Sequence, residues 1–298
     1  MNPGATFVVT GSASGIGAAV AARLRGRGHR VIGVDLHDAD VVADLATQSG
    51  RRAAIDGVLA LCGGHLDGAV MVAGVGPRPG AEDVIATVNV LGVTELLGGW
   101  RTELCADGGG KVVVFGSNSS TTTPLVPERA VRRLMRGEID AAVAQIRRRK
   151  GLSAAIAYAA SKLAVTRWAR KQAASAAWAG CGVRINVVAP GPVLTPMLRA
   201  QLDGPEGQRV RAFPVPVGGF GDPEQFAALV EFLLSPHADF IAGAVLTVDG
   251  GTEALLRDDW PRRLPIMRLP RLLTAMRSRR RAHAAAVGSP ADRGASVL

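Results

Sequence analysis

A tyrosine and a lysine four residues apart are the side chains whose types and spacing best suit chemistry. The 298-residue chain contains a single tyrosine, Tyr158, and Lys162 is one of few lysines. Residues i and i+4 share one face of a helix, so the phenol and the ammonium group can face the same cleft. A nearby cation stabilises phenolate and lowers the tyrosine pKa from about 10. The pair therefore predicts a general acid/base for an alcohol or a carbonyl group. A chance pairing on a surface helix is the alternative, and the single tyrosine argues against it.

A Gly-rich turn is the second chemical signal. It reads Thr10-Gly11-Ser12-Ala13-Ser14-Gly15-Ile16-Gly17 and stands between an apolar run and an Ala-rich stretch. Such glycines permit a tight turn and a close approach of the backbone to a pyrophosphate. The free N–H groups of a helix N-terminus then attract the negative charge of the pyrophosphate. The spacing is GxxxGxG rather than GxGxxG, and glycines also serve plain turns. In its strand-turn-helix context, the turn predicts dinucleotide contacts from Gly11, Ser14, Gly15, Ile16 and Gly17.

Asp35 ends the next apolar run, about 20 residues beyond the turn. A carboxylate at this position accepts hydrogen bonds from both hydroxyls of an adenosine ribose and repels a 2′-phosphate. Neither the Gly-rich turn nor the residue after Asp35 supplies an arginine or lysine to offset that repulsion. The sequence therefore favours NAD over NADP. The alternative is a solvated aspartate that merely ends a strand.

The elements that must position these residues follow from the hydrophobic pattern. Strands are expected at residues 5–10, 30–34, 68–73, 111–115, 183–188 and 244–248. Helices are expected near residues 16–27, 51–61, 81–103, 154–178 and 223–234. Strands that are apolar on both faces and separated by helices indicate a parallel sheet covered on both sides. The predicted fold class is therefore α/β, with a doubly wound, Rossmann-type parallel sheet.

These motifs together resemble the short-chain dehydrogenase/reductase family. The resemblance rests on the Gly-rich turn, Asp35, the Tyr158/Lys162 pair and residues 190–196 (PGPVLTP), and it covers roughly residues 4–252. Residues 29–44, residues 66–77 and the long segment before Tyr158 further resemble the bacterial 3α-hydroxysteroid dehydrogenase/carbonyl reductase group. The resemblance implies an NAD-dependent enzyme that interconverts a secondary alcohol and a ketone, with a hydroxysteroid or a similar apolar alcohol as substrate.

The resemblance also implies catalytic roles for Asn89, Ser117, Tyr158 and Lys162. Tyr158 would donate or accept the proton, and Lys162 would lower its pKa and hold the nicotinamide ribose. Ser117 would hydrogen-bond the substrate oxygen, with Ser119 and Ser120 as neighbouring alternatives. Asn89 would anchor a water relay to the lysine, whereas an ordinary helix asparagine is the alternative.

Further cofactor contacts are implied for Asp44, Ala73, Gly74, Pro190, Gly191, Val193 and Thr195, besides Tyr158 and Lys162. Asp44 would contact the adenine amine. Residues 190, 191 and 193 would cover the nicotinamide face, and Thr195 would reach its carboxamide. Residues 71–74 read Met-Val-Ala-Gly where the family usually has Asn-Asn-Ala-Gly, which removes polar groups from the central strand but no catalytic group. No metal site is expected.

Two basic segments interrupt the α/β pattern and carry the net charge of +10. Residues 128–150 carry +5 and residues 257–298 carry +7, which leaves −2 for the remainder. The first lies in an insertion, residues 121–152, where six apolar residues at helical spacing predict one amphipathic helix with a basic outer side: Val131, Leu134, Met135, Ile139, Val143 and Ile146. This helix would line the substrate pocket, form a dimer contact or merely add stability.

The second basic segment predicts a boundary between a catalytic domain at residues 1–256 and a C-terminal tail at residues 257–298. Prolines 261, 265 and 270 forbid one long helix there, and a disordered tail is expected. One alternative is peripheral binding of the tail to anionic lipid through five apolar residues: Leu264, Ile266, Leu269, Leu272 and Leu273. Another alternative is a lid over an apolar substrate. Nucleic-acid binding is not expected, because no such motif is present and aromatic residues make up 4%.

Composition excludes several other classes of protein. The start shows no signal-peptide pattern, and no apolar stretch approaches 18 residues. Cys62, Cys105 and Cys181 are few and far apart, which excludes a disulfide framework and a clustered metal site; we expect core thiols in a cytoplasmic protein. Family habit and closed symmetry favour a homodimer or homotetramer. A catalytically idle NAD-binding regulator or scaffold remains the alternative to the enzyme.

Overall fold

A seven-stranded parallel sheet forms the centre of the protein, in a computed structural model that describes residues 4–204, 207–259, 270 and 274. The strand order is β3-β2-β1-β4-β5-β6-β7, and every pairing is parallel. The strands are β1 Thr6–Thr10, β2 Arg30–Asp35, β3 Val41–Val42, β4 Gly68–Met71, β5 Lys111–Phe115, β6 Arg184–Pro190 and β7 Val245–Val248. This order confirms the predicted doubly wound fold; the two-residue β3 was not predicted.

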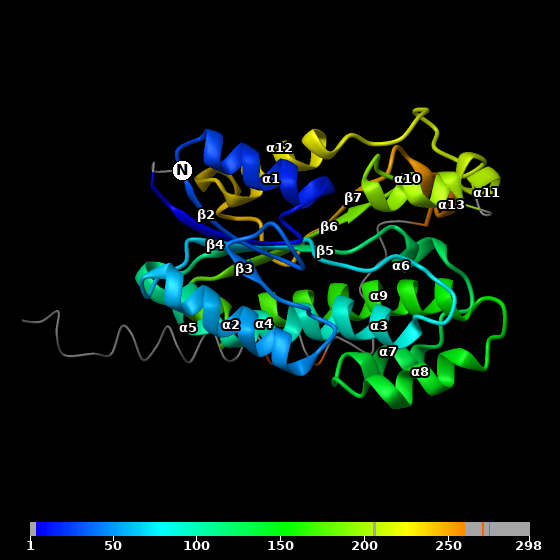
Figure 1. The fold of residues 1–298 in the computed structure, drawn as a ribbon, viewed down its shortest axis with the longest axis horizontal. Coiled ribbons are helices and arrows are strands. Elements are labelled where there is room, and N and C mark those ends of the chain that lie inside the picture. Colours follow the sequence, from blue (N-terminus) through cyan, green and yellow to red (C-terminus); the bar gives the residue numbers. More distant parts are fainter. Residues whose placement is uncertain (1–3, 205–206, 260–269, 271–273, 275–298) are drawn as a thin grey trace, which may run out of the picture. The chain divides into compact units, whose positions relative to one another are not determined.

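Helices cover both faces of the sheet (Figure 1). On one face lie α1 (Gly15–Gly26) and α12 (Pro223–Leu234), which pack on each other. On the other lie α2 (Gln48–Cys62), α4 (Gly92–Gly99) and α9 (Ser153–Ala173). Each face buries its own apolar core, because β strands such as β1 bury alternate residues on both sides: Val8 belongs to one core, and Phe7 and Val9 to the other.

Shorter elements connect these layers. They are α3 Glu82–Ala86, the π-helical turn η1 Thr87–Leu91, α5 Arg101–Leu104, η2 Ala106–Gly108, α6 Ser119–Thr122, α7 Glu128–Leu134, α8 Ile139–Arg147, η3 Ala179–Cys181, α10 Pro196–Asp203, α11 Gly207–Arg211, η4 Pro236–Ala238 and α13 Thr252–Leu256. The single helix expected at residues 81–103 is therefore wrong: it is divided into α3, η1, α4 and α5. In the described part of the chain, no helix is long and apolar enough to cross a membrane.

The insertion corrects a second expectation. Residues 121–152 do not form one amphipathic helix but a pair, α7 and α8, which pack on each other and on α9. The chain reverses at Gly137, whose φ of +76° favours glycine. The apolar residues of the pattern still face inward, since Val131, Leu134, Val143 and Ile146 are all buried.

The cysteines correct a third expectation. Cys62 is a buried free thiol, as expected, but Cys105 and Cys181 form a disulfide and are only partly buried.

Close contacts divide the chain into the units Met1–Leu256 and Arg257–Leu298. The five apolar residues on which the tail alternatives depend lie outside the described residues.

Candidate active site

The predicted site residues follow the carboxyl ends of neighbouring strands. The Gly-rich turn follows β1, Ala73 and Gly74 follow β4, Ser117 follows β5, and residues 190–195 lie at the end of β6. Parallel strands bring all these ends to one edge of the sheet, which is where ligands bind in open α/β folds. The topology therefore gathers residues from distant parts of the sequence around one crevice.

The geometry of the Gly-rich turn requires its glycines. Gly11 has φ +72°, and a Cβ there would lie 2.9 Å from the Ala73 amide nitrogen. Gly15 has φ +54°, and a Cβ there would lie 3.0 Å from Thr195 Cγ2. A Cβ on Gly17 would overlap the Gly11 carbonyl oxygen. The turn thus packs directly against two other loops of the crevice, and side chains at these positions would fill it.

Helix α1 begins at this turn with open hydrogen-bonding capacity. Its N-cap residue, Ser14, makes no side-chain cap, and the first turn of the helix contains no acidic residue. The first N–H groups of a helix lack partners within the helix and attract anions. These residues fit a dinucleotide pyrophosphate.

Asp35 lies beside the turn. Its Oδ2 accepts a hydrogen bond from the Ala13 amide at 2.8 Å, and its Oδ1 accepts one from the Leu36 amide at 2.7 Å. The carboxylate is therefore fixed against the Gly-rich turn, as a ribose-binding acid must be. Asp44 is exposed, and its Oδ1 accepts from the Ala46 amide at 2.9 Å, so part of this carboxylate stabilises the turn before α2.

Ser117 and Tyr158 are brought together from β5 and α9. The Ser117 hydroxyl lies near enough to the Tyr158 phenol to lower its pKa, and Ser117 Oγ also accepts from the Ser119 amide at 3.1 Å. Ser119 and Ser120 instead have buried hydroxyl oxygens without a hydrogen-bond partner in the described structure. The geometry therefore selects Ser117 from the three serines.

Lys162 lies below the tyrosine, only 5% exposed. Its Nζ donates to the Phe115 carbonyl oxygen at 2.9 Å and lies 6.0 Å from the centroid of the Tyr158 ring. Burial lowers the pKa of Lys162 to about 8. Burial raises the pKa of Tyr158, and the hydrogen bond with Ser117 opposes this only in part. The net pKa of Tyr158 is therefore raised rather than lowered, because desolvation of the phenol outweighs the hydrogen bond with Ser117. A lowering by the charge of Lys162 stays a prediction.

Asn89 connects the segment after β4 to α9. It is fully buried in the π-helical turn η1, where its Oδ1 accepts from the Val75 amide at 2.8 Å. Its Nδ2 donates to the Val75 carbonyl oxygen at 3.1 Å and to Ser161 Oγ at 3.0 Å. Ser161 Oγ in turn donates to the Tyr158 carbonyl oxygen at 2.8 Å. The hydrogen bonds of Asn89 thus lead to the backbone of Tyr158, and the water relay to the lysine stays a prediction.

Gly74 allows this close packing. A Cβ there would lie 3.0 Å from Asn89 Oδ1 and 3.2 Å from Lys162 Nζ. Gly191 has a comparable role after β6, because a Cβ there would lie 2.6 Å from Asp249 Cβ. Both glycines are therefore needed for close approach between segments of the crevice.

The segment after β6 forms the remaining wall. Val193 is buried, and Thr195 caps α10 by accepting from the Leu198 amide at 3.3 Å. Helix α10 presents apolar side chains, since Met197 is 43% exposed and its Sδ lies 2.9 Å from where a Cβ on Gly76 would be. The exposed Met197 side chain of α10 therefore packs against the loop that follows β4.

A buried pair missed by the sequence reasoning connects two loops of the site. Asn118 Nδ2 donates to Asp249 Oδ2 at 3.1 Å, and the Asn118 amide donates to the Pro190 carbonyl oxygen at 2.9 Å. Asp249 Oδ1 also accepts from the Gly251 amide at 3.0 Å. Because Asn118 directly follows Ser117, the pair fixes the serine's backbone. The Asp-Gly-Gly sequence after the last predicted strand was the available signal.

The comparisons with known proteins agree with this arrangement. Residues 11–253 match a family model described as enoyl-(acyl carrier protein) reductase, one of those for short-chain dehydrogenases/reductases. The chain belongs to the short-chain dehydrogenase/reductase family, a family of oxidoreductases.

Particular relatives are similar over nearly their whole length. A 3α-hydroxysteroid dehydrogenase/carbonyl reductase from Comamonas testosteroni is 38% identical over 252 residues, which are 84% of this chain and 97% of that protein. A D-threitol dehydrogenase from Mycolicibacterium smegmatis is 30% identical over 272 residues, covering 83% of this chain and 92% of its own. The crystal structure of a 3α-hydroxysteroid dehydrogenase from Pseudomonas sp. B-0831, complexed with NADH, superposes with a TM-score of 0.80 at 42% identity, over 85% of this chain and 99% of that chain.

Proposed function

We propose that the protein is an NAD-dependent oxidoreductase that interconverts a secondary alcohol and a ketone, with Tyr158 as the general acid/base. The observation that carries the proposal is the convergence of Ser117, Tyr158 and the buried Lys162 at the same sheet edge as the Gly-rich turn. A hydroxysteroid or a similar apolar alcohol is the proposed substrate. This choice is supported by the names of two relatives and by the exposed apolar side chains Leu194 and Met197 in and just before α10.

The crevice fits NAD on two structural grounds: the uncapped N-terminus of α1 and the glycine positions that a Cβ would fill. The first amides of α1 would hold the pyrophosphate, and Asp35 would hold the adenosine ribose. We assign further contacts to Asp44, Ala73, Gly74, Pro190, Gly191, Val193 and Thr195 as predicted from the sequence. Bound NAD supplies hydride acceptance or donation at the reacting carbon.

The chain's own residues then handle the proton and the oxygen. Ser117 donates a hydrogen bond to the substrate oxygen, and Tyr158 exchanges the hydroxyl proton with that oxygen. A raised pKa keeps Tyr158 protonated at neutral pH, which suits proton donation to a ketone. In the oxidative direction the phenol must lose its proton, and the charge of Lys162 favours that loss.

A turnover screen of alcohols and ketones, hydroxysteroids included, with NAD and NADP in parallel tests the proposal. Tyr158→Phe removes the proton-transferring group and is expected to lower kcat by about 10²- to 10⁴-fold while NADH still binds. Ser117→Ala and Ser120→Ala form a matched pair, of which only the first should cause a large loss. Full activity in Tyr158→Phe would refute the assigned roles. NADH binding without turnover of any compound would instead indicate the idle NAD-binding protein.

A further inference from the structure

A disulfide lies at the edge of the sheet opposite the proposed active site. Cys105 follows α5 and precedes β5, whereas Cys181 lies in η3 and precedes β6. Both positions are at the amino ends of their strands, while Ser117 and Pro190 lie at the carboxyl ends of the same two strands. The bridge joins residues 76 positions apart, with a Cα–Cα distance of 5.3 Å.

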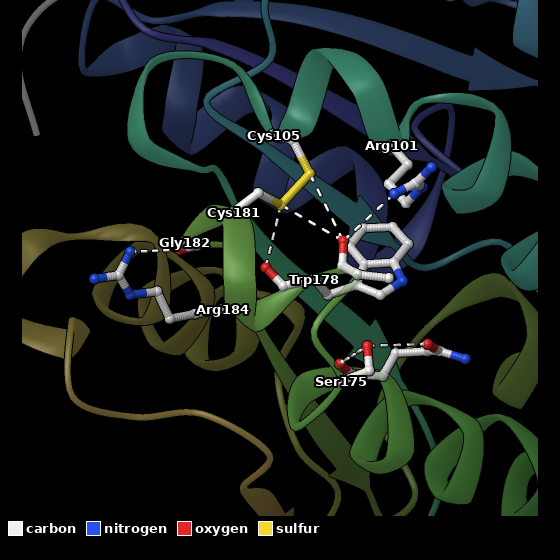
Figure 2. Close-up of a disulfide and its surroundings, with 9 residues drawn as sticks. Arg101, Cys105, Ser175, Trp178, Cys181, Gly182 and Arg184 are labelled. Carbon is white, nitrogen blue, oxygen red and sulfur yellow. Dashed lines mark hydrogen bonds between the residues drawn. A yellow bond between two sulfur atoms is a disulfide. The ribbon is translucent and has the colours of Figure 1, made fainter. Parts of the chain in front are cut away.

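Both cysteines line a surface hollow of about 480 Å³, and Figure 2 shows the bridge between them. Much of its wall is made of small residues: Ala176, Ala177 and Gly180. Arg101 and Thr102 of α5 complete the rim. Both cysteines are partly exposed at this hollow, so a small thiol can approach the bridge from its open side.

Packing of the backbone holds the two cysteines close independently of the sulfurs. A Cβ on Gly109 would overlap the Gly182 carbonyl carbon, and a Cβ on Gly182 would overlap the Gly108 carbonyl oxygen. The Arg184 amide also donates to the Gly110 carbonyl oxygen at 3.1 Å. Cleavage of the bridge therefore leaves the thiols near each other, and their recombination is intramolecular with a high effective concentration.

The surroundings also suit the reduced cysteines. The Ala177 carbonyl oxygen lies 3.6 Å from Cys181 Sγ and 3.9 Å from Cys105 Sγ, and the Trp178 carbonyl oxygen lies 3.2 Å from Cys181 Sγ. Each thiol thus has a carbonyl acceptor in reach. Arg101 Nη1 donates to the same Ala177 oxygen at 3.5 Å, which places a positive charge beside both sulfurs. Figure 2 shows Arg101 and Trp178 beside the bridge.

We propose that Cys105 and Cys181 form a reversible exchange site for anionic thiols of low molecular mass. The thiolate of one small thiol attacks a sulfur of the bridge, so a mixed disulfide forms and the other cysteine leaves as a thiolate that takes up a proton. A second small thiol attacks the mixed disulfide, releasing the small disulfide and the second cysteine. Two small thiols thus lose two electrons and two protons, which the cysteine pair gains. The reverse sequence restores the bridge.

Thiol counting on the native full chain in glutathione redox buffers tests the exchange. Samples are quenched with acid, denatured and labelled with a maleimide. One label, on Cys62, is expected in oxidising buffer and three in reducing buffer, with the change reversible in both directions. Cys62→Ala should keep the two-thiol change, whereas Cys105→Ser should abolish it. Three labels in every buffer would show that no bridge forms. A bridge that resists excess glutathione until the protein is denatured would show a closed structural disulfide; either result overturns the proposal.

Arg101→Gln tests the preference for anionic thiols, with Arg129→Gln on α7 as the matched control. Loss of a unit charge a few ångströms away in water should slow reduction by glutathione about threefold at low ionic strength. Reduction by cationic cysteamine should not slow, and the Arg129 variant should match the parent with both thiols. Equal glutathione rates in the two variants would refute anion selection.

Discussion

Replacement of Lys162 by methionine should remove a pH dependence from the stability of the protein. The ammonium group is almost completely buried, and burial lowers its pKa from 10.5 to about 8. The folded protein therefore holds this proton less tightly than the unfolded chain does. Methionine cannot bind a proton in either state, so the variant lacks this contribution.

The size and sign of this pH dependence follow from the pKa shift of Lys162 on folding. A lowering from 10.5 to about 8 corresponds to about 3 kcal/mol of differential interaction between the two protonation states. Between pH 8 and 10.5 the unfolded state binds more protons, so the free energy of unfolding rises with pH. Below pH 8 both states are protonated, and the full penalty of burying the charge is present. The parent should therefore gain about 3 kcal/mol relative to the methionine variant across this window.

Urea unfolding at intervals from pH 7 to 10.5 measures this difference, because groups shared by the two proteins cancel. Lys162→Met also removes the donor to the Phe115 carbonyl oxygen, but that loss shifts the whole curve and leaves its pH dependence unaffected. Lys171→Met, which removes an exposed lysine from the same helix, is the control and should give a constant difference. Parallel curves for the parent and Lys162→Met would refute the argument that burial penalises this ammonium group.

Three further substitutions test the cofactor crevice and the loops around it. Gly17→Ala places a methyl group against the Gly-rich turn and should weaken NADH binding at least about tenfold, as measured by fluorescence titration, whereas Gly26→Ala, with open space around it, should not. Asp35→Ala removes the carboxylate that repels a 2′-phosphate, so the ratio of kcat/KM with NADP to that with NAD should rise by about tenfold or more; an unchanged ratio would contradict its role. Asn118→Ala leaves the buried Asp249 carboxylate without one donor, so the free energy of unfolding should fall by about 1–3 kcal/mol together with kcat; unchanged values of both would contradict a positioning role.

The sheet and the Gly-rich turn could be predicted because their signals are local. Strands such as residues 111–115 are apolar on both faces, which is enough to indicate a parallel sheet buried by helices. Once the sheet is parallel, its topology brings the turn, Ser117 and residues 190–195 to one edge without further information. The spacing of Tyr158 and Lys162 likewise depends only on helix geometry.

The environment of that pair could not be predicted in the same way. The carbonyl oxygen of Phe115, which accepts from Lys162, belongs to a strand 47 residues away, and the burial that sets both pKa shifts comes from several elements. The helical pattern at residues 81–103 also gave no sign of the π-helical turn at Asn89, because a change of hydrogen-bond partner leaves the apolar spacing nearly intact. The Cys105–Cys181 bridge depends on a Cα–Cα distance that only tertiary packing sets.

The insertion shows how a structure can change the meaning of a charge pattern. Its net charge of +5 suggested a basic outer surface, yet Arg147 forms ion pairs with Glu82 and Asp83 of α3, and Glu128 accepts hydrogen bonds from Arg167 of α9. These contacts join α8 to α3 and α7 to α9, the helix that contains Tyr158.

The same packing changes the choice among the three roles considered for the insertion. A dimer contact through the predicted apolar stripe is no longer required, since that stripe is already buried within the chain against α3 and α9. What remains exposed is mostly the basic side, including Arg148, Arg149 and Lys150, together with Leu125 and Leu152 near the two ends of the insertion. The packing therefore favours the stabilising role, because the pair supports α9, the helix that carries Tyr158 and Lys162. A contact between subunits made by this segment would use its charged side or the two exposed leucines.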